Sequence, residues 1–153
     1  MEVRISPMIN EDLGEVLEIE RDSFICPWSR GAFEKELLRK SHAYYIVAKY
    51  PLNNNKTVGY GGVWLLFDEA HITTLAVHPS HRRTGIGNAL LRNLLQQSFL
   101  KGVCQVVLEV RDSNYIAQRM YEKYGFKEKG KRRNYYYDED AVVMVCMMES
   151  FIL

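Results

Sequence analysis

Apolar residues recur at helical spacing in the first part of the chain. Residues 13–24 place them three or four positions apart, and residues 33–38 do so again. Asn10 or Asp12 can cap the first of these helices, and Ser29 can cap the second, because short polar side chains accept hydrogen bonds from free backbone amides. The pattern therefore predicts two short amphipathic helices near the N-terminus.

The rest of the chain alternates between strand-like and helix-like segments. A long amphipathic helix is predicted from Ile86 to about Lys101, and a shorter one from Tyr115 to Tyr124. Segments rich in β-branched and aromatic residues predict strands at 3–6, 43–49, 57–67, 71–77, 106–110, 126–131 and 141–148. The last strand is apolar on both faces and should be interior. This order of elements is typical of an α/β sandwich.

Three glycines interrupt the strand predicted at 57–67. They are Gly59, Gly61 and Gly62, and glycine inside a strand weakens it. We therefore expect a bulge in this strand, or a close approach of another segment.

The composition indicates a soluble globular protein and argues against several other classes of protein. The 153 residues are 47% hydrophobic and 25% charged, which indicates one soluble domain over residues 1–153. Apolar runs are too short to cross a bilayer, and the N-terminus lacks a secretory signal, so we expect a cytoplasmic protein. A net charge of +1 argues against nonspecific binding to nucleic acid or membranes. Three scattered cysteines lack the spacing of a metal site or a disulfide framework.

The clearest local motif is Arg82-Arg83-Thr84-Gly85-Ile86-Gly87-Asn88, between a predicted strand and the long helix. Glycines at such a junction let the main chain approach a ligand, and free amides at the helix start favour an anion such as a diphosphate. A P-loop would need Lys and Ser or Thr after the second glycine, and a dinucleotide fingerprint would need a third glycine. Both alternatives are therefore disfavoured.

The motif and its context resemble a known superfamily. Arg82, Gly85 and Gly87, after the strand Leu75-Ala76-Val77, resemble the acetyl-CoA-binding motif of the GCN5-related N-acetyltransferases (GNAT). The segments that resemble its RimI-type ribosomal-protein-alanine N-acetyltransferases and archaeal N-terminal acetyltransferases are Pro27-Trp28-Ser29, Leu108-Glu109-Val110-Arg111, Arg132-Arg133-Asn134-Tyr135-Tyr136 and Glu139-Asp140-Ala141. Asn114, Tyr121 and Gly125-Phe126 also fall at superfamily positions, and Asn114 can in addition cap the helix that follows it.

The resemblance implies a fold and a cosubstrate. The fold would be a mixed, mostly antiparallel central sheet flanked by about four helices, and the cosubstrate would be acetyl-CoA, with no metal. The residues implied to bind the cosubstrate are Leu75, Ala76, Val77, Arg82, Arg83, Thr84, Gly85, Ile86, Gly87, Asn88 and Asn114.

Acetyl transfer to an amine needs a base for the amine and a proton for the departing thiolate. Glu109 interrupts an apolar strand, and the resemblance makes it the base. The alternative is a half-exposed glutamate paired with Arg111 or a lysine. The resemblance makes Tyr121 the acid, whereas by itself it would be a core aromatic of its helix. His71 is a weaker alternative base.

The acceptor is inferred from the resemblance. Residues implied to contact it are Phe24, Pro27, Trp28, His71, Tyr135 and Tyr136. The predicted activity is N-α-acetylation of protein N-termini, of a ribosomal protein or a broader set, by a monomer or weak dimer. The alternatives are a small-molecule amine N-acetyltransferase on the same fold and a non-catalytic CoA-binding sensor.

Overall fold

The computed structural model describes residues 2–150, which cluster into two compact units. The first unit comprises residues up to Trp64 together with Thr73–Leu94. The second comprises Leu65–Ile72 together with the described residues from Leu95 onward. The prediction of one domain over residues 1–153 reaches beyond the described residues at both ends and stays a prediction.

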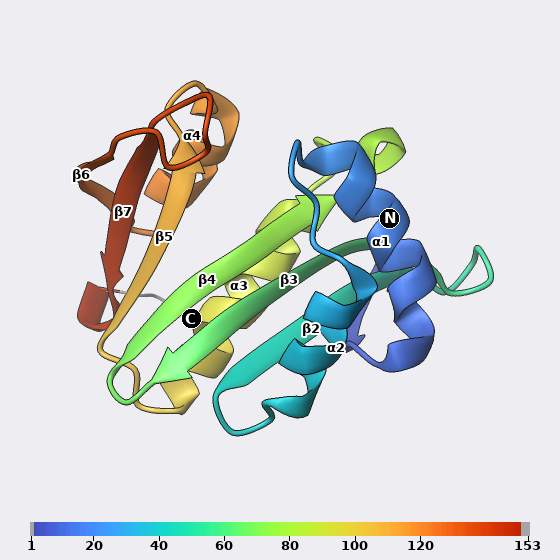
Figure 1. The fold of residues 1–153 in the computed structure, drawn as a ribbon. Coiled ribbons are helices and arrows are strands. Elements are labelled where there is room, and N and C mark those ends of the chain that lie inside the picture. The colour runs from blue at the N-terminus through green and yellow to red at the C-terminus, as the bar shows by residue number, and fades with distance from the viewer. Residues whose placement is uncertain (1, 151–153) are drawn as a thin grey trace. The chain divides into compact units, whose positions relative to one another are not determined.

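The helices and strands follow the predicted order (Figure 1). The strands are β1 (Arg4–Pro7), β2 (Ala43–Tyr50), β3 (Lys56–Leu66), β4 (Glu69–Val77), β5 (Gln105–Arg111), β6 (Lys127–Arg132) and β7 (Ala141–Met147). The helices are α1 (Leu13–Ser23), α2 (Arg30–Leu38), α3 (Ile86–Leu100) and α4 (Tyr115–Lys123), with 3-10 turns at η1 (Asn10–Asp12), η2 (Pro79–His81) and η3 (Met148–Ser150). None of the helices within residues 2–150 is long and apolar enough to span a membrane.

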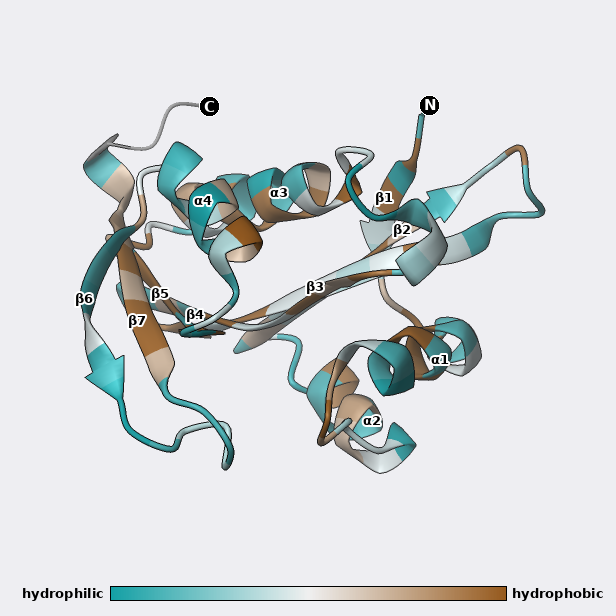
Figure 2. Ribbon diagram, turned by 90° about the horizontal axis from the view of Figure 1, so that it is seen from above, coloured by the Kyte–Doolittle hydropathy of each residue, from teal (hydrophilic) through white to brown (hydrophobic). Residues whose placement is uncertain are grey.

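The strands form a seven-stranded sheet in the order β1-β2-β3-β4-β5-β7-β6. Antiparallel pairing joins β1 to β2, β2 to β3, β5 to β7 and β7 to β6, whereas β4 and β5 pair in parallel. The predicted fold class, a mixed and mostly antiparallel sheet with four helices, is therefore confirmed. The apolar β7 lies between β5 and the hydrophilic β6, as its sequence predicts (Figure 2).

The first unit has its main core between α1, α2 and the strands β2 and β3. Both helices lie on one side of the sheet (Figure 2), and their apolar side chains are buried in this core, where removal from water stabilises the unit. The buried residues of this cluster are Met8, Leu13, Val16, Ile19, Phe33, Ala43, Tyr45, Val47, Tyr60 and Ala76.

The expected effect of the glycines in β3 is confirmed. A Cβ on Gly59 would lie 3.0 Å from Leu90 Cδ1 of α3 and 3.1 Å from the carbonyl oxygen of Ala76, so only glycine lets α3 pack this closely. The β2–β3 register also shifts between Ala48 and Lys49, which is the predicted bulge. The first turns of α3 therefore pack directly against β3 at Gly59.

Gly62 provides a test of the first core. An added Cβ would overlap the buried ring of Tyr45, which is only 5% exposed and is held by a 2.7 Å hydrogen bond between its hydroxyl and Thr73 Oγ1. Gly62→Ala should therefore lower the free energy of unfolding by about 1–3 kcal/mol, measured by urea denaturation. Gly130→Ala is the control, because its Cβ would meet nothing within 4 Å. An unchanged stability for Gly62→Ala would contradict this packing.

Of the two helix caps predicted near the N-terminus, one is confirmed and the other is wrong. Ser29 Oγ accepts a 3.2 Å hydrogen bond from the amide of Ala32, so Ser29 caps α2. Neither Asn10 nor Asp12 caps α1 through its side chain, because both belong to the η1 turn that precedes the helix. The carboxylate of Asp12 instead pairs with Lys49 Nζ at 2.6 Å, a partner on β2 that no local pattern could reveal.

Candidate active site

The glycine loop lies in the first unit, between β4 and α3. Arg82 turns back onto the protein, where its Nε donates to the carbonyl oxygen of Val77 at 3.0 Å and its Nη2 donates to Ser23 Oγ at 3.1 Å. The hydroxyl of Thr84 donates to the carbonyl oxygen of His81. These hydrogen bonds fix the conformation of the loop, and those of Arg82 connect the loop to β4 and to the end of α1.

Gly85 faces open space at the start of α3. Its φ is +91°, and a Cβ built on it would meet nothing within 4 Å. The helix begins at Ile86 with no acidic residue in its first turn, and its first amides lack intrahelical partners. Because these amides and the helix dipole both favour negative charge, the loop fits the predicted diphosphate.

The parallel ladder between β4 and β5 brings His71 beside Glu109. It pairs His71 with Val107 and ends there. Side chains alternate along a strand, so Glu109 lies on the same face as Val107, one diagonal step from His71. His71 Nε2 lies 2.7 Å from Glu109 Oε1. All of these residues belong to the second unit.

The two carboxylate oxygens of Glu109 have different surroundings. Oε1 accepts a second hydrogen bond, 3.2 Å long, from the hydroxyl of Tyr135. Oε2 is buried and has no hydrogen-bond partner among the described residues. The side chain is only 5% exposed. A buried carboxylate oxygen without a partner is costly, and it is a group that a bound amine or water would satisfy.

Opposing influences act on the pKa of Glu109. Burial raises it, but the hydrogen bond and charge of His71, the hydroxyl of Tyr135 and the charge of Arg132 together hold the pKa below its ordinary value. Glu109 is therefore ionised at neutral pH and able to accept a proton. The alternative pairing of Glu109 with Arg111 or a lysine is not what the structure shows.

Arg111 instead anchors the loop that carries Tyr135. Its Nη1 lies 2.9 Å from Asp138 Oδ1 and 3.2 Å from Glu139 Oε1, and its guanidinium lies 4.6 Å from the centre of the Tyr136 ring. These contacts fold the β6–β7 loop back toward β5. Sequence reasoning missed this role, although Arg111 lies two residues from Glu109 and so shares its face of β5.

Tyr121 lies on α4 in the second unit. Its side chain is 8% exposed and packs against Phe126, with ring centres 5.7 Å apart. Burial raises the pKa of Tyr121 to about 12, so the phenol keeps its proton at neutral pH. At the start of the same helix, Asn114 Oδ1 accepts a 3.1 Å hydrogen bond from the amide of Ala117, which confirms the predicted cap.

The other predicted acceptor residues lie on two loops, one in each unit. In the first unit, Phe24 and Pro27 are exposed between α1 and α2, while the indole of Trp28 packs on Phe33 with ring centres 5.1 Å apart. In the second, Tyr135 and Tyr136 meet edge to face at 4.9 Å. Direct contacts therefore join His71, Glu109 and the β6–β7 loop, whereas the glycine loop and residues 24–28 belong to the first unit.

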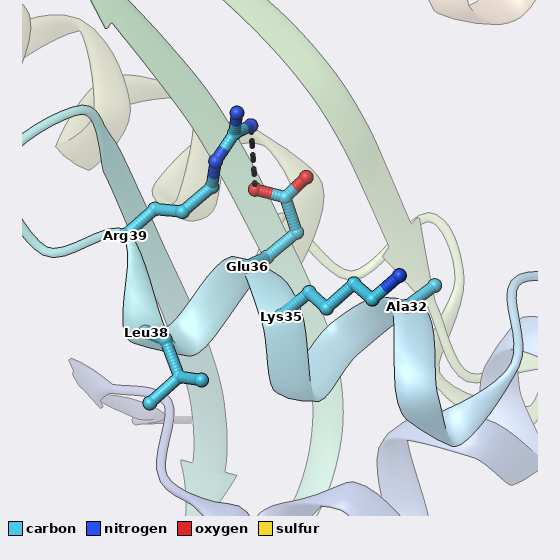
Figure 3. A pocket seen from close by; sticks show the side chains of 5 residues that line it. All are labelled: Ala32, Lys35, Glu36, Leu38 and Arg39. Carbon is cyan, nitrogen blue, oxygen red and sulfur yellow. Dashed lines mark ion pairs between the residues drawn. The ribbon is translucent and has the colours of Figure 1, made fainter.

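Two surface depressions are lined by residues of α2. The larger, of about 510 Å³, is lined by Ala32, Lys35, Glu36, Leu38 and Arg39, where Glu36 and Arg39 approach to 3.9 Å (Figure 3). The smaller, of about 250 Å³, also includes Glu36. Neither contains a residue predicted to carry chemistry. Within residues 2–150, no cluster of His, Cys, Asp or Glu could hold a metal ion.

A mixed sheet with four helices, together with a glycine loop between β4 and α3 that suits an anion, is typical of acyl-CoA-dependent transferases. More narrowly, the chain belongs to the acetyltransferase (GNAT) family, whose model matches residues 13–126. This membership confirms the predicted class of activity, acetyl transfer from acetyl-CoA to an amine.

Individual relatives agree with this assignment. A protein of Bacillus subtilis, provisionally named a ribosomal protein bS18-alanine N-acetyltransferase, is 39% identical over 136 residues, 88% of each chain. The crystal structure of the ribosomal-protein-S18-alanine N-acetyltransferase from Escherichia coli matches with a TM-score of 0.86 and 31% identity, covering 99% of this chain and 100% of that one. Ard1 from Thermoplasma volcanium matches with a TM-score of 0.84 and 26% identity, covering 96% and 98%.

Proposed function

We propose that this protein acetylates the α-amino group at the N-terminus of a protein, with Glu109 as the general base. The observation that carries the proposal is the buried carboxylate whose Oε1 is held by His71 and Tyr135, while Oε2 has no hydrogen-bond partner within residues 2–150. The names of the relatives support a ribosomal protein as the acceptor. Such an acceptor is made in the cytoplasm, where we therefore place the enzyme.

The first proposed step is activation of the amine. A free α-amino group has a pKa of about 8, so much of it is protonated at neutral pH and must lose a proton before it attacks the thioester. Glu109 takes this proton through Oε2, directly or through one water. His71 then has a positioning role, because its Nε2 holds the other carboxylate oxygen.

The second step is collapse of the tetrahedral intermediate. As the carbon–sulfur bond breaks, the thiolate of CoA takes a proton, and Tyr121 is the proposed donor. Its raised pKa supports this role, because the phenol is protonated when the thiolate leaves. Main-chain amides of Leu75, Ala76 and Val77 polarise the acetyl carbonyl in this proposal. That edge of β4 lies beyond the ladder with β5, which ends at His71.

The diphosphate of acetyl-CoA is proposed to bind at residues 82–88. The open space at Gly85 and the N-terminus of α3 support this placement. Asn114 is proposed to contact the pantetheine arm through its amide nitrogen, because its side-chain oxygen caps α4. For the acceptor we propose residues 24–28 together with Tyr135 and Tyr136.

Tyr121→Phe tests the acid. The substitution removes only the hydroxyl, so kcat should fall by about 10²-fold while the KM for acetyl-CoA stays within about threefold. Steady-state release of CoA, followed with a thiol reagent, measures both. Tyr124→Phe on the next turn is the control and should retain wild-type kcat. A normal kcat for Tyr121→Phe would leave Tyr121 as a core aromatic without a catalytic role.

A panel of acceptors tests the proposed function as a whole. The purified protein is incubated with acetyl-CoA and with peptides that differ in their first residue, including Ala, and with polyamines and small amines. Mass spectrometry then locates the acetyl group. Acetylated peptide N-termini support the proposal. Acetylated polyamines with untouched peptides would favour a small-molecule acetyltransferase, and CoA binding without turnover would favour a sensor.

A further inference from the structure

Glu20 is a buried carboxylate to which the proposed chemistry gives no role. Its side chain lies near the end of α1, and the residue is 3% exposed. Oε2 accepts a 2.9 Å hydrogen bond from the backbone amide of Trp28, and Oε1 accepts a hydrogen bond from the hydroxyl of Tyr60 on β3. Burial and the Glu20 carboxylate raise the pKa of Tyr60, so that hydroxyl keeps its proton and acts as the donor.

Burying an ionised carboxylate at position 20 is energetically unfavourable. Burial raises the pKa of Glu20, although the bonds from Tyr60 and Trp28 favour the ionised form. The residue also lies in the last turn of α1, where the helix dipole disfavours negative charge. A well-packed apolar side chain is often at least as stabilising as a buried ionic group. Stability alone therefore does not account for Glu20.

The contacts of Glu20 close the loop between α1 and α2 at both ends. Its carbonyl oxygen accepts a 3.1 Å hydrogen bond from the amide of Phe24, and its carboxylate accepts one from the amide of Trp28. The exposed segment 24–27, which links α1 to α2 (Figure 1), is thus tied at both ends to one residue of α1. Beyond it, the indole of Trp28 is fixed against Phe33.

We propose that Glu20 is a positioning residue that holds the 24–28 loop in the shape that receives the first residue of the acceptor, and so determines the KM for the acceptor. This inference rests on the proposed function, because it takes the loop as part of the acceptor site. Glu20 contacts no reacting atom. Its effect is transmitted through the backbone amide of Trp28, which donates to its carboxylate at the C-terminal end of the loop.

The double variant Glu20→Leu with Tyr60→Phe separates positioning from stability. It replaces the buried polar pair with apolar groups of similar volume and leaves no unpaired hydroxyl. Only the amide of Trp28 loses its partner, so the Tm should fall by no more than about 10 °C and the variant should stay folded under assay conditions. With an N-terminal alanine peptide, its KM for the peptide should rise about tenfold, while the KM for acetyl-CoA stays within about twofold. A purely structural role would move neither KM once the fold is intact.

Two single variants complete the design. Glu20→Gln keeps an oxygen for the Trp28 amide and should restore the peptide KM to within about threefold of the wild type. Glu18→Gln, an exposed carboxylate on the same helix, is the matched control and should change nothing. If the double variant does not fold, Glu20→Asp replaces it, because its shorter side chain cannot reach both partners and should raise the peptide KM about threefold or more.

The outcomes distinguish this inference from the function it rests on. A wild-type peptide KM in the folded double variant, or in Glu20→Asp, overturns the inference and leaves N-terminal acetylation standing. A wild-type enzyme that acetylates no peptide overturns both. A raised peptide KM in the double variant, restored by Glu20→Gln, supports the inference.

Discussion

Glu109→Gln is expected to lower kcat by about 10²- to 10³-fold while the affinity for CoA stays within about twofold. An amide can keep the hydrogen bonds of Oε1 to His71 and Tyr135, but it cannot take a proton from the attacking amine. Pre-steady-state acetylation of a peptide measures the chemical step, and calorimetry with CoA measures binding. A kcat within threefold of the wild type would remove Glu109 from the mechanism.

The pH dependence sharpens this test. Because the pKa of Glu109 is held below the ordinary value of a glutamate, its carboxylate is already ionised at neutral pH and stays ionised at higher pH. The ratio of wild-type to Glu109→Gln activity should therefore stay constant from about pH 6 to about pH 9. Glu69→Gln is the matched control, since Glu69 lies on β4 in the same unit and hydrogen-bonds Gln105 on β5. It should keep wild-type activity.

Gly85→Trp is expected to weaken the binding of CoA by about 100-fold or more. Gly85 faces open space, so the indole would occupy the region proposed for the diphosphate, and a φ of +91° strains any residue but glycine. Equilibrium dialysis with CoA measures the change. Gly102→Trp is the control, because it has a φ of +83° and equally open surroundings at the other end of α3.

The comparison of the two glycine variants removes the effect of backbone strain. Both substitutions place a large side chain on a left-handed backbone, but Gly85 adjoins the N-terminus of α3 whereas Gly102 follows its C-terminus. If Gly85→Trp binds CoA as well as Gly102→Trp does, the diphosphate lies elsewhere and the proposed cosubstrate site is wrong.

Local features were predictable because their physics is local. The apolar spacing of α3 and the alternation along β4 follow from helix and strand geometry, so the order of elements could be predicted and is confirmed. The caps at Ser29 and Asn114 involve partners three residues away. The glycine loop also depends on neighbours in sequence, apart from the bond between Arg82 and Ser23.

The hydrogen-bond partners of Glu109 could not be predicted from local sequence patterns. His71 is 38 residues away, and its approach depends on the register that pairs it with Val107. Tyr135 reaches Oε1 from a loop that is anchored by Arg111. The sequence showed that Glu109 is a carboxylate within an apolar strand, which marks it as unusual. It did not show which residues surround that carboxylate.

Glu20 gave a similar signal that was overlooked. It lies seven residues after Leu13 and four after Val16, on the same buried face of α1. A carboxylate at a core position of a helix should have been marked in the same way as Glu109 in its strand. Its partners, Trp28 and Tyr60, come from a loop and from β3.

By itself, the sequence determined which segments are helices and strands, where a diphosphate could meet free amides, and that Glu109 is out of place in its strand. These are consequences of periodicity and of single residue types. The tertiary structure alone decided that Oε1 of Glu109 is held while Oε2 has no partner in the described part of the chain, and that Glu20 closes the 24–28 loop. Both depend on strand register and helix packing, which bring distant residues to within hydrogen-bond distance.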